Sequence, residues 1–162
     1  MEIRKATVQD LPGILEILNY EIQHSTAVYD ENIRSLDQLN AWFLEKNKAG
    51  FPVFVAAENQ QILGYATFGT FRPHDGFRRT VEHSIYISKD IRGRGIGHLL
   101  MEQIINAGRE LGYHVMVAGI DANNVKSIQF HLGFDFVEVG RMTEVGQKFG
   151  AWLDLVFLQK ML

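Results

Sequence analysis

The fold of this chain is decided by residues 92–97, which read Arg92-Gly93-Arg94-Gly95-Ile96-Gly97. An alternating, strand-like run over residues 81–87 precedes them. A strand, a glycine-rich turn and a helix N-terminus form an anion site, because glycines let backbone N–H groups converge and the helix start carries partial positive charge. Two guanidinium groups add full charges that suit phosphate oxygens. The stretch therefore predicts a phosphate-binding loop that opens a helix with the apolar face Ile96, Leu99, Leu100, Ile104, Ala107 and Leu111.

The spacing of the glycines distinguishes this loop from two common phosphate-binding motifs. A P-loop requires G-x-x-x-x-G-K-[ST], and no Lys-Ser or Lys-Thr pair is present here. A dinucleotide-binding turn requires G-x-G-x-x-G, but the third glycine, Gly97, falls one place early. The alternative to a phosphate site is a glycine-rich turn with two solvated arginines.

Apolar periodicity along the rest of the chain predicts a mixed α/β architecture. The first half is rich in hairpins and the second alternates strands with helices, so we expect a single mixed, mostly antiparallel twisted sheet with helices on both faces. The strand before the glycines, the main helix and the next strand would form a right-handed parallel crossover, with the loop at the carboxyl end of its strand. Strands are expected over residues 3–6, 52–57, 62–71, 81–87, 115–120, 136–141 and 152–159, and helices over residues 11–18, 36–43, 95–111 and 124–131.

Length and composition narrow the functional class. The 162 residues suit one domain over residues 1–162, with 46% hydrophobic and 22% charged residues. A net charge of −3 and the lack of a basic stripe argue against a nucleic-acid partner. No cysteine is present, and no signal peptide or membrane span is evident, so we expect a cytoplasmic protein without a membrane partner. The six histidines are scattered without ligand spacing, so no metal is expected.

The chain resembles one enzyme family over its whole length, and four segments carry the resemblance. The chain looks like a GNAT superfamily acyltransferase, and within that superfamily it resembles the phosphinothricin N-acetyltransferase branch. The loop Asp75-Gly76-Phe77-Arg78 is similar to that of enzymes that acetylate methionine sulfone and methionine sulfoximine. The resemblance implies the GNAT fold, acetyl-CoA as cosubstrate and a homodimer. The matching segments are Pro52–Ala56, Thr80–Ile87, Arg92–Gly97 and Val145–Asp154.

The resemblance also implies a role for particular residues. Glu82 would be the general base, and Asn124 would hydrogen-bond the cofactor. The backbone of Ile85, Tyr86 and Ile87 would pair with the pantetheine arm as an added strand. The loop over residues 72–78 would hold the acceptor through Arg72, Asp75, Phe77 and Arg78. The pyrophosphate would lie against Arg92, Gly93, Arg94, Gly95, Ile96, Gly97 and His98.

Elementary chemistry supports these assignments. An α-amine with a pKa of roughly 8 is mostly protonated at pH 7, so a carboxylate such as Glu82 must take its proton before it attacks a thioester. Backbone N–H groups near Ile87 would stabilise the tetrahedral oxyanion. No Ser/His/Asp arrangement is evident, so we expect direct transfer without an acyl-enzyme. Arg72 and Arg78 suit the carboxylate or phosphinate of an acceptor, the alternative being that both are solvated. Phe77 either lines the acceptor site or packs within the loop over residues 72–78 and stabilises it.

One segment departs from the family pattern. The family carries two further residues between the short-helix histidine and Leu-Gly-Phe, whereas here His131 runs directly into Leu132-Gly133-Phe134. This deletion rotates the helix end by about 200°. No tyrosine is present in the segment, so the general acid stays unassigned. His83, on the opposite strand face from Glu82, is expected to pack, and Trp152 is assigned to the core or to a subunit interface.

Three functions are consistent with these observations. The first is N-acetylation of the α-amine of a small amino-acid-like acceptor. The second is acetylation of a protein or peptide amine, which would use the same cofactor loop but needs an open groove. The third is coenzyme A binding without catalysis, against which the carboxylate of Glu82 argues.

Overall fold

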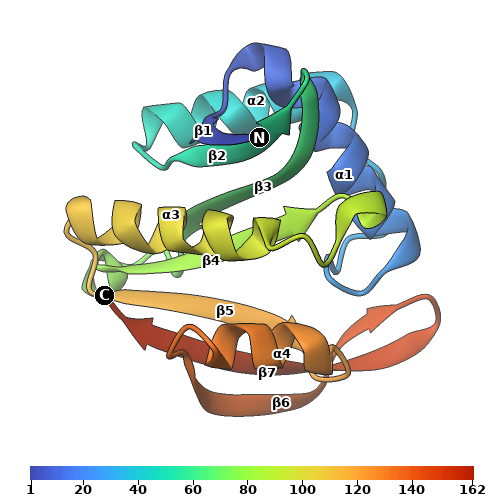
Figure 1. The fold of residues 1–162 in the computed structure, drawn as a ribbon. Helices are drawn as coiled ribbons and strands as arrows, with labels where there is room; N and C mark the ends of the chain where they lie inside the picture. The colour runs from blue at the N-terminus through green and yellow to red at the C-terminus, as the bar shows by residue number, and fades with distance from the viewer.

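The computed structural model describes residues 1–162 and contains one seven-stranded sheet in the order β1-β2-β3-β4-β5-β7-β6 (Figure 1). Every neighbouring pair is antiparallel except β4 and β5. The predicted mixed, mostly antiparallel sheet is confirmed. The strands are β1 (Glu2–Lys5), β2 (Val53–Glu58), β3 (Gln61–Thr70), β4 (Thr80–Ile87), β5 (Val115–Asp121), β6 (Val137–Lys148) and β7 (Ala151–Met161). The helices are α1 (Leu11–His24), α2 (Leu36–Lys48), α3 (Ile96–Glu110) and α4 (Val125–Leu132).

The parallel strands β4 and β5 separate soon after they begin. Their register extends only from Thr80–Glu82 to Val115–Val117. Beyond that point, β4 pairs only with β3, and β5 pairs only with β7. The sheet therefore opens between the carboxyl ends of these two strands, and the backbone of β4 past Glu82 has no strand partner on that side.

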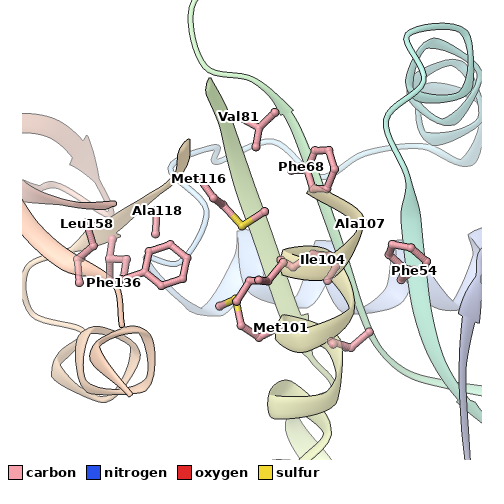
Figure 2. Packing of buried hydrophobic residues seen from close by; sticks show 14 of the residues in the cluster. Phe54, Phe68, Val81, Met101, Ile104, Ala107, Met116, Ala118, Phe136 and Leu158 are labelled. Atoms are coloured by element: carbon pink, nitrogen blue, oxygen red, sulfur yellow. The ribbon is translucent and has the colours of Figure 1, made fainter. Parts of the chain in front are cut away.

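Helices cover both faces of the sheet. On one face, α3 contributes Met101, Ile104 and Ala107 to a core that includes Phe68 of β3 and Met116 of β5 (Figure 2). On the other face, α1 and α2 pack a second apolar cluster against β2 and β3. These two cores fix the relative positions of the loop before α3 and the segment after α1.

The start and end of α3 follow from two glycines. Gly95 precedes the helix with φ +76°, and Gly112 follows it with φ +76°. Both angles lie in the left-handed region, where a glycine has no Cβ to clash. The structure thus confirms that the glycine-rich turn opens the helix, and it shows that Gly112 ends it.

The C-terminal hairpin differs from the prediction in one strand, and of the two places predicted for Trp152 only the subunit interface stays open. We expected a strand over residues 136–141, but β6 extends to Lys148 with register shifts against β7. Most of its residues are exposed, so no buried alternation marks its length. Trp152 is 61% exposed and does not belong to the core.

No helix of the structure has both the length and the apolar character needed to cross a membrane.

Candidate active site

A cleft of about 930 Å³ lies where β4 and β5 separate. Almost all of the predicted cofactor-binding residues line it. Arg94 is the exception, since its guanidinium points to the Glu58 carboxylate at 3.6 Å and does not line the cleft. The lining residues among those predicted are Ile85, Tyr86, Ile87, Arg92, Gly93, Gly95, Ile96, Gly97, His98 and Asn124.

The loop before α3 has the geometry of an anion cradle. Gly93 has φ +86° and Gly95 has φ +76°, and a Cβ built on either residue would meet no atom within 4 Å. No side chain caps the first turn of α3. Uncapped N–H groups and the helix dipole therefore face the cleft, which fits the pyrophosphate of coenzyme A.

The guanidinium of Arg92 is held by a buried acid. It donates a hydrogen bond to the carboxylate of Glu21, whose side chain is only 4% exposed. Ser25 Oγ donates to the other oxygen of Glu21 at 2.6 Å. The sequence did not identify Glu21 because it lies 71 residues from Arg92, on an apolar helix.

The opposite wall of the cleft comes from α4. Asn124 caps this helix, since its Oδ1 accepts from the backbone amide of Ser127 at 3.1 Å. The Asn124 amide nitrogen is thereby left to donate to a ligand. Phe130 and the unpaired edge of β4 also line the cleft, and an unpaired strand edge suits an extended chain with amide groups.

A second cavity of about 340 Å³ contains Glu82 and adjoins the cleft, with which it shares Tyr86 and Asn124. The Glu82 carboxylate extends towards β5, where a Cβ added to Gly119 would lie 3.0 Å from Glu82 Oε1. Burial raises the pKa of Glu82, and the positive charge of Arg72 opposes that shift. A half-buried carboxylate next to a phosphate cleft is suited to accept a proton from a bound amine.

Two buried histidines lie on the other face of β4. The Nε2 atoms of His83 and His131 are 3.1 Å apart, and His131 Nδ1 lies 2.6 Å from the carbonyl oxygen of Ser127. A carbonyl only accepts, so His131 Nδ1 carries the proton and its Nε2 accepts from His83. His83 Nδ1 is then a buried acceptor without a partner. His83 packs against Phe136 as expected, and both histidine rings also line the cavity that contains Glu82.

The predicted acceptor loop lies outside both cavities. Arg72 stacks on Phe71 with 4.5 Å between guanidinium and ring. Phe77 also packs on Phe71, at 5.8 Å, and stays 42% exposed. Arg78 donates to the carbonyl oxygen of Asp75 at 3.0 Å. The loop is thus a self-contained turn, and its link to the site is the charge of Arg72 on Glu82.

Several contacts that shape the site could not be recognised from the sequence. Thr26 donates to the buried carboxylate of Asp121, and both line the cleft. Lys148 is 1% exposed and reaches the segment after α1. A buried lysine in a polar strand is a tertiary feature that local periodicity does not report.

Comparisons with known proteins agree with this geometry. A family model described as Acetyltransferase (GNAT) family matches residues 17–134. The L-methionine sulfoximine/L-methionine sulfone acetyltransferase of Pseudomonas paraeruginosa is 46% identical over 97% of this chain and 92% of that protein.

Two solved structures are similar over most or all of their length. A phosphinothricin acetyltransferase from Sinorhizobium meliloti in complex with acetyl-CoA is 33% identical, with a TM-score of 0.96 over 99% of this chain and 88% of that one. A ribosomal-protein-alanine N-acetyltransferase from Brucella melitensis is 44% identical, with a TM-score of 0.99 over 100% of both chains. By its fold, its cleft and its sequence, the chain belongs to the acetyltransferase (GNAT) family.

Proposed function

We propose that this protein transfers the acetyl group of acetyl-CoA to the α-amine of a small amino acid of the methionine sulfone, methionine sulfoximine or phosphinothricin type. One observation carries the proposal: the carboxylate of Glu82 lies in a cavity that shares wall residues, Tyr86 and Asn124 among them, with the cleft of the glycine loop. A base and an anion-binding channel at adjoining positions are what transfer from a coenzyme A thioester to an amine requires. The relatives named for these acceptors support the substrate class.

The chain holds acetyl-CoA along the separated edge of β4. Gly93, Gly95 and the first turn of α3 bind the pyrophosphate, with Arg92 and His98 beside it. The backbone of residues 85–87 hydrogen-bonds the pantetheine amides, and Asn124 donates its free amide nitrogen. Bound in this way, acetyl-CoA supplies a thioester carbonyl at the junction of the cleft and the second cavity.

Glu82 prepares the acceptor for attack. It removes a proton from the ammonium group, directly or through water, so that the neutral amine adds to the carbonyl carbon. Backbone N–H groups near Ile87 stabilise the negative oxygen that forms. The C–S bond then breaks, the amide keeps the acetyl group, and the thiolate leaves. Ser84, Ser127, His83 and His131 line the cavity, but the histidine nitrogens bond to each other and to a backbone carbonyl and not to a hydroxyl, which supports direct transfer.

The positive charge of Arg72, which acts on Glu82, supports recognition of an anionic acceptor. Arg72 is the cation whose charge acts on Glu82, and Asp75, Phe77 and Arg78 form the loop that follows it. We propose that this loop holds the carboxylate end of the acceptor.

We further propose a cytoplasmic homodimer that binds neither nucleic acid nor membranes. The C-terminal hairpin supports the dimer, since it exposes apolar side chains that a second copy would cover. A net charge of −3 supports the absence of nucleic acid. The exposed apolar residues are Val137, Val139, Met142, Val145, Phe149 and Trp152.

Acetylation of a protein or peptide amine is the second candidate. It is favoured by the similarity to the Brucella structure, which is described as a ribosomal-protein-alanine N-acetyltransferase. An enzyme of this kind would need to admit a peptide chain behind the reacting amine.

A free-thiol assay with acetyl-CoA separates the two candidates. The purified protein is offered L-methionine sulfone, L-methionine sulfoximine, L-phosphinothricin and a peptide that begins with alanine. Turnover on the free amino acids with none on the peptide is expected. Turnover on the peptide alone would replace the proposal by the second candidate, and no thiol release with any acceptor would contradict both.

A further inference from the structure

The segment between α1 and the following loop forms a wall shared by both cavities. Ser25, Thr26 and Ala27 line the cleft, and Ala27, Val28 and Tyr29 line the cavity that contains Glu82. None of residues 25–29 belongs to a helix or strand. The position of this wall must therefore come from contacts with other parts of the chain.

A buried lysine at the end of β6 supplies two of these contacts. Lys148 Nζ donates to the carbonyl oxygen of Ser25 at 2.7 Å and to that of Val28 at 2.6 Å. It also lies 4.8 Å from the ring centroid of Phe149. No carboxylate lies within ion-pair distance of Nζ, so its charge is satisfied by carbonyl oxygens and an aromatic face.

Other residues of the hairpin contact the same segment and the residues just after it. The Tyr29 hydroxyl donates to the carbonyl oxygen of Asp154 at 3.4 Å, and a Cβ on Gly146 would lie 2.8 Å from the Tyr29 ring. The Phe149 amide donates to Glu31 Oε1 at 2.9 Å. In Figure 1 the β6–β7 hairpin projects beyond the other strands on the side where α1 ends. The segment is thus anchored to the hairpin along its length, more than a hundred residues away in the chain.

We propose that Lys148 is a positioning residue that sets the acceptor wall: it fixes residues 25–29 against the hairpin, and so places Val28 and Tyr29 across the cavity from Glu82. The inference rests on the proposed transfer to an amino acid. Glu21 and Asp121 hold Ser25 and Thr26 on the coenzyme side independently of Lys148. Loss of Lys148 should accordingly affect the acceptor far more than acetyl-CoA.

The test compares Lys148→Met with Gly146→Ala. The first removes both hydrogen bonds but keeps the side-chain length. The second displaces Tyr29 without altering Lys148, because the new methyl group would overlap its ring. Gly140→Ala is the matched control, since it lies on the same strand and its Cβ would meet nothing within 4 Å. For each protein the KM for L-methionine sulfone and for L-phosphinothricin, and the dissociation constant for acetyl-CoA, are measured.

The expected result is a rise of about 10- to 100-fold in acceptor KM for both variants, because small displacements of a substrate-positioning wall have effects of that size. The ratio of kcat/KM between the two acceptors should also change. Affinity for acetyl-CoA should change by less than about threefold, and Gly140→Ala should match the unaltered protein. Unchanged acceptor constants in Gly146→Ala and in folded Lys148→Met would overturn the proposal.

Hydrogen exchange provides a readout that needs no turnover. The amides of residues 25–30 should exchange faster in Lys148→Met and Gly146→Ala than in Gly140→Ala. Equal exchange in all three proteins would contradict the proposal that the hairpin holds residues 25–29 in place. If Lys148→Met fails to fold, Gly146→Ala still decides whether contacts with the hairpin position the acceptor wall, and unchanged constants and exchange in it would overturn the proposal. Absence of turnover by the unaltered protein with every acceptor would contradict the proposed function. The exchange result would still decide whether the hairpin holds residues 25–29 in place.

Discussion

The carboxylate of Glu21, buried within α1, forms an ion pair with the guanidinium of Arg92 in the loop before α3. Glu21 is 4% exposed at its side chain, whereas Arg92 is 54% exposed and lines the cleft. The buried acid therefore holds an exposed cation at the proposed site of the coenzyme phosphates. The same pair prevents an unneutralised negative charge from facing those phosphates.

Arg92→Ala should weaken both the fold and the binding of acetyl-CoA. Glu21 would keep its hydrogen bond from Ser25 but lose its cation, at a cost of roughly 1–3 kcal/mol of unfolding free energy. Loss of one charge-assisted phosphate contact should weaken acetyl-CoA binding by about tenfold or more. Urea denaturation and isothermal titration calorimetry measure the two effects.

The double variant Arg92→Ala/Glu21→Gln separates the two roles of the pair. Removing the buried charge should restore most of the stability, because no unpaired ion remains. The affinity for acetyl-CoA should stay low, because the guanidinium is still absent. Recovery of affinity in the double variant would show that Arg92 does not contact the coenzyme.

Removal of the Arg72 charge should move the acid limb of the pH–rate profile. Burial raises the pKa of Glu82, and Arg72 partly counteracts this. A base must be deprotonated, so kcat/KM falls as the pH drops through the pKa of Glu82. Arg72→Met should raise that pKa further and shift the limb to higher pH. Arg78→Met is the control, and identical limbs in both variants would exclude Arg72 as the cation that acts on Glu82.

The local features of this fold could be predicted from the sequence. The positive φ angles of Gly93 and Gly95, and the helix that follows them, come from a short motif with a clear backbone requirement. The apolar strands and the parallel crossover follow from period-two and helical patterns. Such features depend on residues that are close together in the sequence. They can therefore be predicted without a structure.

The partners of the polar residues could not be predicted in this way. Glu21 meets Arg92 across 71 residues, and Lys148 meets Ser25 across 123. The extension of β6 to Lys148 also escaped prediction, because exposed polar residues and register shifts hide its alternation. These features are set by tertiary packing, where any local signal is weak.

The buried histidine pair should make the protein sensitive to acid. Burial lowers the pKa of His83 and of His131 in the folded state. The unfolded chain, with a histidine pKa of about 6.5, therefore binds more protons as the pH falls below that value. The free energy of unfolding should decline from about pH 6.5 downwards, by at most about 1.4 kcal/mol per pH unit for each histidine.

His83→Phe tests this assignment. It removes one of the two buried titrating groups, together with the unpartnered Nδ1. The difference in unfolding free energy between pH 8 and pH 5 should shrink relative to the unaltered protein, as measured by urea denaturation at each pH. The same pH dependence in both proteins would show that His83 does not contribute.

The measurement that tests the central claim most directly is the single-turnover rate of Glu82→Gln with bound acetyl-CoA and saturating L-methionine sulfone. The variant keeps the shape of the side chain next to Gly119 but cannot take a proton. We predict a loss of about 100-fold or more in the rate of N-acetyl product formation, with the dissociation constant for acetyl-CoA nearly unchanged. A rate equal to that of the unaltered enzyme, or a loss explained wholly by weaker acetyl-CoA binding, would contradict the account.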